Sequence, residues 1–302
     1  MSESHWRWKA FQKELDYFAL DKQVITEVHI KDIDVLTSEF TQLRERSRTE
    51  LGRLIRNLKK QDPDNPAFLS VSLLGLLHGT GLRETAHTRL LAWFFDPEKA
   101  KHEHGLPETL FISVLEWIRS EYESDWPEGE YVTITIEAEK YTRDGNRIDL
   151  WIEGKVIAKD KSYSEWLVVI EAKVEANLSK EQLKPYETEA KNWKNKNKNR
   201  LAPCFIYLKD GTDADVNNRN NNWNPMSFVT LVEILWPKIK SAKITNSLQY
   251  SDGYHLARYY LAGILSDIEG WTLPLKVSNG GFDYQKIDFA RSLTLNGGVS
   301  NE

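Results

Sequence analysis

An apolar run interrupted by charge constrains this chain more than any other stretch. Residues 167–174 read LVVIEAKV, with β-branched residues on both sides of the glutamate and the lysine. Such a run predicts a central strand buried on both faces. Because side chains alternate along a strand, Glu171 and Lys173 share one face with Val169. The predicted strand therefore ends in two opposite charges, which burial disfavours unless they are paired or functional.

A second predicted strand lies upstream, at residues 147–152 (RIDLWI). Its isoleucines and leucine form one apolar face, and Asp149 falls on the other. If the two strands are neighbours, Asp149 and Glu171 converge, and two close carboxylates repel unless a proton or a cation lies between them. Mg²⁺ suits such a pair, because it commonly takes one or two carboxylates, keeps several waters and binds phosphate oxygens. Lys173 beside them can orient the attacking water or stabilise charge on a phosphate, so we predict metal-dependent phosphodiester hydrolysis.

These residues resemble the signature of a known family. Asp149, followed by Glu-Ala-Lys at residues 171–173, resembles the active site of the PD-(D/E)XK nuclease superfamily. Gln182 and Tyr186 are four residues apart on one predicted helical face, and they resemble the Q-x-x-x-Y element of the RecB-like branch. Pro185 departs from a regular helix within that spacing, and in the second turn it would leave a local bend.

A third segment extends the likeness. Residues 84–92 (ETAHTRLLA), followed by WFFDP, resemble the E-x-x-H-(S/T)-x-x-L-A segment of stand-alone bacterial nuclease proteins in this superfamily. The likeness covers roughly residues 80 to 210. It implies an α/β fold with a restriction-endonuclease-like mixed β-sheet core flanked by helices and an N-terminal helical extension.

The resemblance also implies a role for each site residue. Lys173 would orient or activate water, and Gln182 and Tyr186 would position the scissile phosphate or a ligand water. The metal would be Mg²⁺, for which Mn²⁺ would substitute. Its implied ligands share an oxygen donor directed at the site: Asp149, Glu171, the Ala172 carbonyl, Glu84 and Glu139.

Several of these residues also have a structural interpretation. Glu84 suits the first turn of a helix, where the helix dipole stabilises a carboxylate, and Glu139 would fit an exposed strand face equally well. His87 shares the helical face of Glu84, so it either orients that glutamate or is a packed side chain. The H-x-H at residues 102–104 lacks a partner pair at the spacing of zinc sites, which disfavours zinc.

The chain predicts an N-terminal arm and one larger domain. Residues 32–60 carry apolar side chains three, four or seven apart, which predicts a long amphipathic helix. Pro63 and Pro66 end that helix and suggest a junction. We therefore expect a helical arm over residues 1–66 and a nuclease domain over residues 67–302.

The alternation of apolar and polar residues and the positions of turn-forming residues predict further secondary-structure elements. Besides the two strands above, we expect strands at residues 131–139 and 202–209, a hairpin turn at 144–146, a polar connection at 154–164, a loop at 210–225, and helices at 228–239 and 254–268. The tail beyond Trp271 shows no firm pattern.

The number and distribution of charged residues bear on whether the chain can bind nucleic acid. The net charge is −5, but clustered cations matter more than the total for phosphate binding. Residues 184–200 are rich in lysine and directly follow the predicted catalytic helix, although a solvated helix end is the simpler interpretation. The cations that we expect to contact DNA lie near the hairpin turn or in this run: Arg143, Arg147, Lys184, Lys191 and Lys194.

The compartment is also constrained. Cys204 is the only cysteine, so the chain forms no internal disulfide and we expect a reducing cytoplasm. The first residues lack the apolar core of a signal peptide, and no stretch has the length and apolarity of a membrane span. We expect DNA as partner and leave open a homodimer or a partner subunit that supplies recognition.

Competing functions remain at this point. A catalytically inactive nuclease-fold module that binds nucleic acid or protein is the main alternative, and a hydrolase of RNA or of a small molecule is another. By analogy with stand-alone bacterial relatives, the nuclease would act in defence against foreign DNA or in restriction.

Overall fold

The computed structural model describes residues 30–69, 83–122, 126, 128–173, 180–210, 222–245, 251–269, 271 and 284–296. The chain divides into two compact units, Met1–Leu54 and Ile55–Glu302. In the first unit the described residues all belong to helix α2 (Ile30–Gln61), whose last turns lie in the second unit. The long helix predicted over residues 32–60 is therefore confirmed, and the domain boundary at residue 66 stays a prediction.

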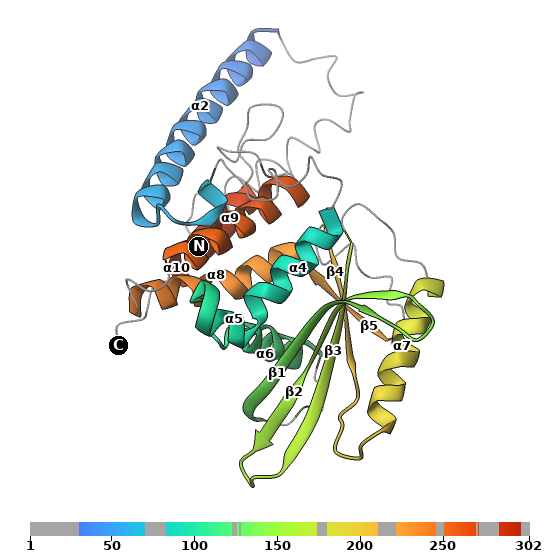
Figure 1. Ribbon diagram of the computed structural model, residues 1–302. Coiled ribbons are helices and arrows are strands. Elements are labelled where there is room, and N and C mark those ends of the chain that lie inside the picture. Colours follow the sequence, from blue (N-terminus) through green and yellow to red (C-terminus); the bar gives the residue numbers. More distant parts are fainter. Residues whose placement is uncertain are drawn as a thin grey trace. The chain divides into compact units, whose positions relative to one another are not determined.

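A five-stranded mixed sheet forms the centre of the second unit (Figure 1). The strands follow one another in chain order across the sheet: β1 (Gly129–Tyr141), β2 (Arg147–Ala158), β3 (Tyr163–Lys173), β4 (Cys204–Lys209) and β5 (Trp223–Ser227). The pairs β1–β2 and β2–β3 are antiparallel, whereas β3–β4 and β4–β5 are parallel. The predicted α/β fold, with a mixed sheet flanked by helices, is confirmed.

Helices cover both faces of the sheet (Figure 1). Helix α7 (Lys180–Asn195) lies on one face, where Leu183 and Tyr186 pack in a buried cluster with Trp151 and Val169. The other face carries α4 (Arg83–Phe95), α6 (Leu110–Tyr122) and α8 (Phe228–Thr245). Residues 166–173 of β3 are all buried, as expected for a strand covered on both sides.

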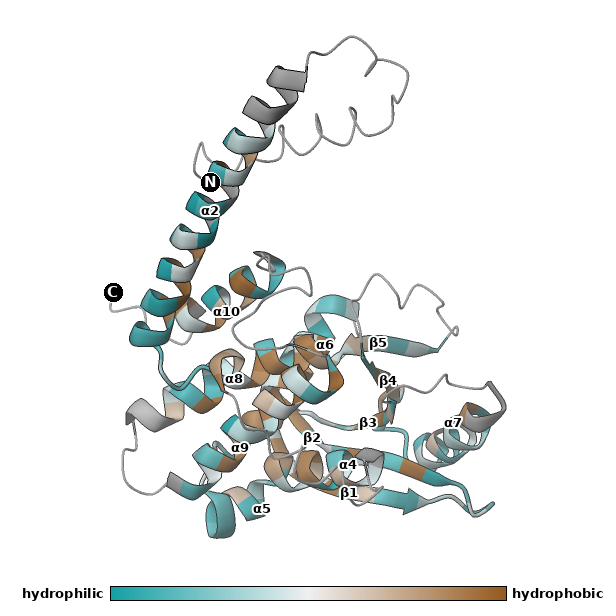
Figure 2. Ribbon diagram, turned by 90° about the horizontal axis from the view of Figure 1, so that it is seen from above, coloured by the Kyte–Doolittle hydropathy of each residue, from teal (hydrophilic) through white to brown (hydrophobic). Residues whose placement is uncertain are grey.

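Shorter elements complete the described part of the chain. They are η2 (Pro66–Phe68), α5 (Pro97–Lys99), η4 (Ala100–His104), α9 (Ser251–Gly263), η6 (Ile264–Ile268) and α10 (Tyr284–Asn296). Hydrophobic residues are concentrated on α6, whereas α2 is mainly hydrophilic (Figure 2). Among the helices that the structure describes, none combines the length and the apolar character needed to cross a bilayer.

The β2–β3 hairpin corrects one expectation. The polar connection predicted over residues 154–164 is wrong, because β2 continues to Ala158 and β3 begins at Tyr163, with Ile157 paired to Tyr163. At this end of the hairpin, exposed residues alternate with buried ones along β2, so the sequence resembles that of a loop although the backbones of the two strands are paired. The tight turn predicted at 144–146 is confirmed, and its Gly145 has a φ of 76°, which favours glycine.

Two more elements were not expected from the sequence. Residues 223–225 were assigned to a loop, but they begin β5, which pairs with β4; residues 211–221 of that loop lie outside the described residues. Pro225 is tolerated because β5 is an edge strand. The tail forms helix α10, whose buried Ile287, Ala290 and Leu293 recur every three residues.

The segment after α2 is anchored by buried polar groups. The Asp62 carboxylate accepts a hydrogen bond from Lys240 Nζ at 2.8 Å. The fully buried Asn65 accepts one from the amide of Ala67 at 2.9 Å and donates through Nδ2 to the carbonyl of Ala290 at 2.8 Å. Because both ends of the Asn65 amide are satisfied inside the protein, this segment is part of the packed body.

We predict that Asn65→Ala lowers the free energy of unfolding by about 2 kcal/mol, since it removes the buried hydrogen bonds of Asn65 with the Ala67 amide, the Ala290 carbonyl and the Thr294 hydroxyl. Urea unfolding measures the change. Asn195→Ala is the control, because Asn195 is exposed, and its effect should stay within about 0.5 kcal/mol. Equal stability of the two variants would contradict the anchoring role.

His104 is a buried side chain with both ring nitrogens engaged. Its Nδ1 accepts a hydrogen bond from the Leu106 amide at 3.1 Å, so Nε2 carries the proton and donates to the Trp93 carbonyl at 2.8 Å. Burial is the main cause that lowers the pKa of His104 below its usual value. Folding therefore favours the neutral ring, and protonation favours the unfolded chain.

This predicts a specific dependence of stability on pH. The stabilisation should be complete above about pH 6.5, the unperturbed value, and should be lost as the pH falls towards the lower pKa of the folded protein. In unfolding measured from pH 7.5 to 5, His104→Gln should show a shallower decline than the wild type. His102→Gln, at an exposed position, should keep the wild-type slope. Three equal slopes would contradict the assignment.

Candidate active site

The strands β2 and β3 separate at one end of the sheet. Their last paired residues are Leu150 and Ile170. Beyond that pair β2 continues against β1, and β3 continues against β4. Asp149 and Glu171 are the next residues on each strand, so they lie where the two strands begin to diverge.

Asp149, Glu171 and Lys173 are brought together at this point. All three are buried, with 6%, 1% and 8% of their surface exposed. Asp149 Oδ2 accepts a hydrogen bond from the amide of Ala172 at 2.9 Å, and Lys173 Nζ lies 2.9 Å from Glu171 Oε1. Ala172, whose amide binds Asp149, lies between Glu171 and Lys173 in the chain. This hydrogen bond therefore ties the Asp149 carboxylate to the segment of β3 that carries Glu171.

Glu139 of β1 lies at the position across the sheet that corresponds to Asp149 of β2 and Glu171 of β3, and we call these three residues the carboxylate row. It falls between the pairs Ala138–Leu150 and Lys140–Ile148, opposite Asp149. Its carboxylate meets two guanidinium groups, from Arg89 of α4 and Arg147 of β2. The structure therefore places Glu139 beside the carboxylate pair but engages it with arginines.

Helix α7 supports β2 through Tyr186. The Tyr186 side chain is buried, and its hydroxyl donates a hydrogen bond to the carbonyl of Arg147 at 2.6 Å. Pro185 lies inside α7, which nevertheless runs on to Asn195. Gln182 is in the first turn of α7, and its side chain lies outside the described residues.

The E-x-x-H segment lies in α4. Glu84 is the second residue of the helix, and its side chain also lies outside the described residues. His87 is buried, with Nδ1 3.4 Å from the hydroxyl of Tyr260 and its ring packed near Phe228. His87 therefore contacts aromatic residues of α8 and α9.

All five cations predicted to contact DNA lie at the surface. They are Arg143, Arg147, Lys184, Lys191 and Lys194. Arg143 is 4.0 Å from Glu189. Arg89 was missed by the sequence reasoning, although it lies within the E-x-x-H segment, because its role depends on a contact between α4 and β1.

The donor set fits a hard divalent cation. In the described part of the chain, no group of three or more His, Cys, Asp or Glu side chains could hold a metal ion. Mg²⁺ does not require such a group, since it binds through one or two carboxylates and retains water. Asp149 and Glu171 supply two buried carboxylates on rigid strands, so these residues are compatible with Mg²⁺ but not with a zinc site of three or four side chains.

Thiol chemistry does not fit the site. Cys204 is buried at the start of β4, and burial raises its pKa to about 12. A thiol with that pKa stays protonated near neutrality, whereas the thiolate is the nucleophile and the metal ligand.

Comparison with known proteins decides the family. The family model described as the PD-(D/E)XK nuclease superfamily matches residues 75–255, more than half of the chain. The chain belongs to the PD-(D/E)XK nuclease superfamily. Among solved structures, the MspJI restriction endonuclease in complex with a 27-mer oligonucleotide is similar at 15% identity and a TM-score of 0.24, over 63% of this chain and 37% of that one. No curated protein matches the chain.

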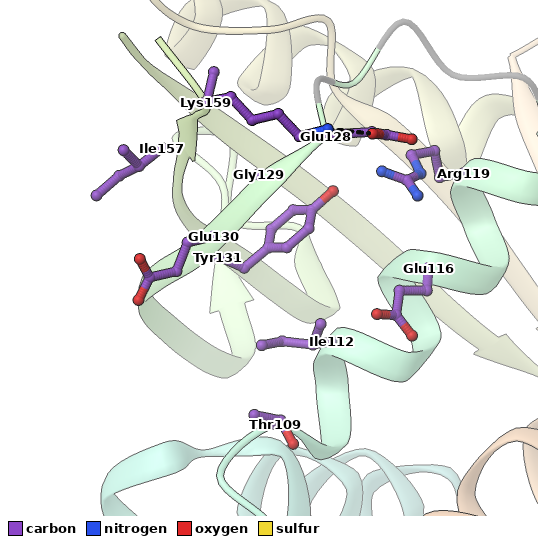
Figure 3. A pocket seen from close by; sticks show the side chains of 11 residues that line it. Thr109, Ile112, Glu116, Arg119, Glu128, Gly129, Glu130, Tyr131, Ile157 and Lys159 are labelled. Carbon is purple, nitrogen blue, oxygen red and sulfur yellow. Dashed lines mark ion pairs between the residues drawn. The ribbon is translucent and has the colours of Figure 1, made fainter. Parts of the chain in front are cut away.

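A pocket of about 850 Å³ lies elsewhere on this PD-(D/E)XK protein, between α6 and the far end of the β1–β2 hairpin (Figure 3). Ile112, Glu116 and Arg119 line it from α6, and Tyr131 lines it from β1. Tyr131 and Glu139 are eight residues apart on β1, a span of about 27 Å. The pocket contains none of the predicted site residues and is separate from the carboxylate row.

In this superfamily member, Tyr186→Phe should reduce the free energy of unfolding by about 1 kcal/mol, because it removes the donor that binds the Arg147 carbonyl. Tyr141→Phe is a matched control, since Tyr141 is 70% exposed. Chemical denaturation of both variants makes the comparison. If the two are equally stable, the Tyr186 hydroxyl does not support β2.

Proposed function

We propose that this protein is a Mg²⁺-dependent nuclease that hydrolyses phosphodiester bonds in DNA. The observation that supports it is the meeting of Asp149, Glu171 and Lys173 where β2 and β3 diverge. Membership of a nuclease superfamily gives the reaction class, and the metal and the substrate are our inference from the chemistry of the site.

Asp149 and Glu171 would hold the ion, with the Ala172 carbonyl and Glu84 as further oxygen donors. A divalent ion bound there would lower the pKa of a water molecule and polarise the phosphoryl group. The carboxylates carry the opposite charge to the ion and lie in a buried setting, where their attraction to it is stronger than in water.

Lys173 has two tasks in this proposal. Its ammonium group is 2.9 Å from Glu171, one of the two carboxylates that would hold the ion. From there it can donate hydrogen bonds to the attacking water and to the phosphate oxygens on which negative charge develops. Lys173 is buried, with 8% of its surface exposed, so the surrounding side chains restrict its movement.

Helix α7 would orient the substrate and support the site. Tyr186 acts through the Arg147 carbonyl and so positions β2, two residues before Asp149. Gln182, one turn earlier on α7, would contact the scissile phosphate or a ligand water. Arg143, Lys184, Lys191 and Lys194 would contact the flanking backbone of the DNA. Their charges are exposed and available for phosphates.

A nuclease-fold module without catalysis is the second candidate. It is favoured by the engagement of Glu139 with two arginines, which occupies one of the carboxylates that the resemblance implies as metal ligands. It would keep DNA or protein binding but lose metal-dependent cleavage. For the active protein, we propose a cytoplasmic role in defence against foreign DNA or in restriction, with a second copy or a partner subunit supplying recognition.

We predict that the purified protein cleaves DNA only with Mg²⁺ or Mn²⁺, and that Lys173→Ala or Asp149→Asn lowers the rate by about 100-fold or more. Linear and circular DNA should be compared side by side, with RNA as a third substrate. Lys155→Ala is the control, because Lys155 is exposed near the far end of β2. Undiminished cleavage by Lys173→Ala would overturn its role, and metal-independent cleavage would overturn the mechanism.

A further inference from the structure

Three charged side chains from three elements meet beside the carboxylate pair. Arg89 of α4 approaches Glu139 of β1 with Nε at 2.8 Å and Nη2 at 2.5 Å from Oε2. Arg147 of β2 places Nη1 3.1 Å from Oε1. The Glu139 side chain is only 13% exposed, whereas those of Arg89 and Arg147 are 65% and 45% exposed. The carboxylate is thus covered by two guanidinium groups that themselves face solvent.

The charges of this cluster favour an anion. Two guanidinium groups share one carboxylate, so the cluster carries a net positive charge at its exposed side. Arg89 uses Nε and Nη2 on a single oxygen, and in the described part of the chain the guanidinium of Arg147 makes an ion pair but no hydrogen bond. Each guanidinium carries five N–H donors in a planar fork that matches phosphate oxygens. Most of these donors remain available.

The backbone turns Glu139 out of the regular alternation of β1. Its φ is 55°, in the left-handed region that residues other than glycine seldom adopt. Glu137 and Lys140, three residues apart, form an ion pair on one face, and Lys140 lies over the ring of Trp151. In a regular strand residues three apart point to opposite faces, so the alternation breaks at this position. Such conformations persist where the surrounding structure enforces them, often at functional sites.

The position of the cluster relates it to the site. Arg147 precedes Asp149 by two residues on β2, a distance of about 7 Å along the strand. Its carbonyl is held by Tyr186, so the backbone of Arg147 is fixed next to the carboxylates. A nucleic-acid strand whose scissile phosphate lies at Asp149 and Glu171 would pass a neighbouring phosphate close to Arg147 and Arg89.

We propose that Arg89 and Arg147 form a phosphate clamp for the nucleic-acid backbone beside the cleaved bond, with Glu139 as the positioning residue that holds both arginines. The location of the clamp rests on the proposed nuclease function. Glu139 then acts through the arginines: its Oε2 accepts both hydrogen bonds of Arg89, and its Oε1 faces Arg147 across an ion pair without accepting a hydrogen bond. We therefore assign Glu139 to positioning rather than to metal binding. This replaces the ligand role that the sequence predicts for Glu139.

DNA binding in EDTA tests the clamp without any cleavage. For Arg89→Gln and for Arg147→Gln, the Kd for a short DNA duplex should rise several-fold, and the slope of log K against log salt should fall by about 1 in magnitude for each lost phosphate contact. Arg89→Lys keeps the charge but loses the fork, so its Kd should lie between those of the wild type and Arg89→Gln. Lys159→Gln, exposed at the far end of the hairpin, should bind like the wild type.

Glu139→Gln separates positioning from metal binding. The clamp predicts a higher KM with a smaller change in kcat, and wild-type affinity for Mn²⁺ by calorimetry, whereas Asp149→Asn should lose Mn²⁺ affinity. Loss of Mn²⁺ binding in Glu139→Gln would make Glu139 a ligand and overturn its positioning role.

The two proposals fail in different ways. If the wild type cleaves DNA but the arginine variants bind with unchanged Kd and salt slope, the clamp is wrong and the nuclease stands. If the wild type does not cleave DNA with any divalent metal, the nuclease is wrong, and the EDTA binding series still decides whether the arginines bind phosphate.

Discussion

The burial of two carboxylates at the point where β2 and β3 part is the constraint on which the proposed site depends. Asp149 and Glu171 lie just past the last pair of the β2–β3 ladder, with less than a tenth of either residue exposed. Burial raises the free-energy cost of each charge and strengthens the repulsion between them. The fold offsets part of this cost with the Ala172 amide and the Lys173 ammonium. A divalent cation bound between the two carboxylates would offset the rest of this cost. For this reason the arrangement of the side chains suggests a metal site.

The rest of the domain holds these groups in place. β3 is covered on both faces, so the backbone that carries Glu171 and Lys173 has little freedom. α7 packs its buried residues against Trp151 and Val169 and holds the start of β2 through Tyr186. α4 reaches the same end of the sheet from the other side through Arg89 and Glu139. Two helices on opposite faces thus converge on the point where β2 and β3 part, and substrate contacts are expected from both.

Sequence reasoning predicted the elements whose pattern is local. The buried strand, the turn at Gly145 and the long helix α2 each have a strong periodic or turn signal, and all three are present. The paired end of the β2–β3 hairpin was missed because exposed residues alternate with buried ones there and only backbone pairing defines it. The edge strand β5 was missed because it directly follows an asparagine-rich run and contains Pro225, although Trp223 and Met226 are buried. The contact between Arg89 and Glu139 joins residues 50 positions apart, and no local pattern announces it. The side chains of Glu84 and Gln182 lie outside the described residues, so their roles rest on the sequence.

The central claim is that Asp149 and Glu171 share one divalent ion. Anomalous diffraction from crystals grown with Mn²⁺ tests it most directly, because it locates the ion independently of activity. The account predicts a single strong peak within about 2.5 Å of an oxygen of each carboxylate, with water completing the coordination. A peak that touches only one of them, or no peak at this position at saturating Mn²⁺, would contradict it.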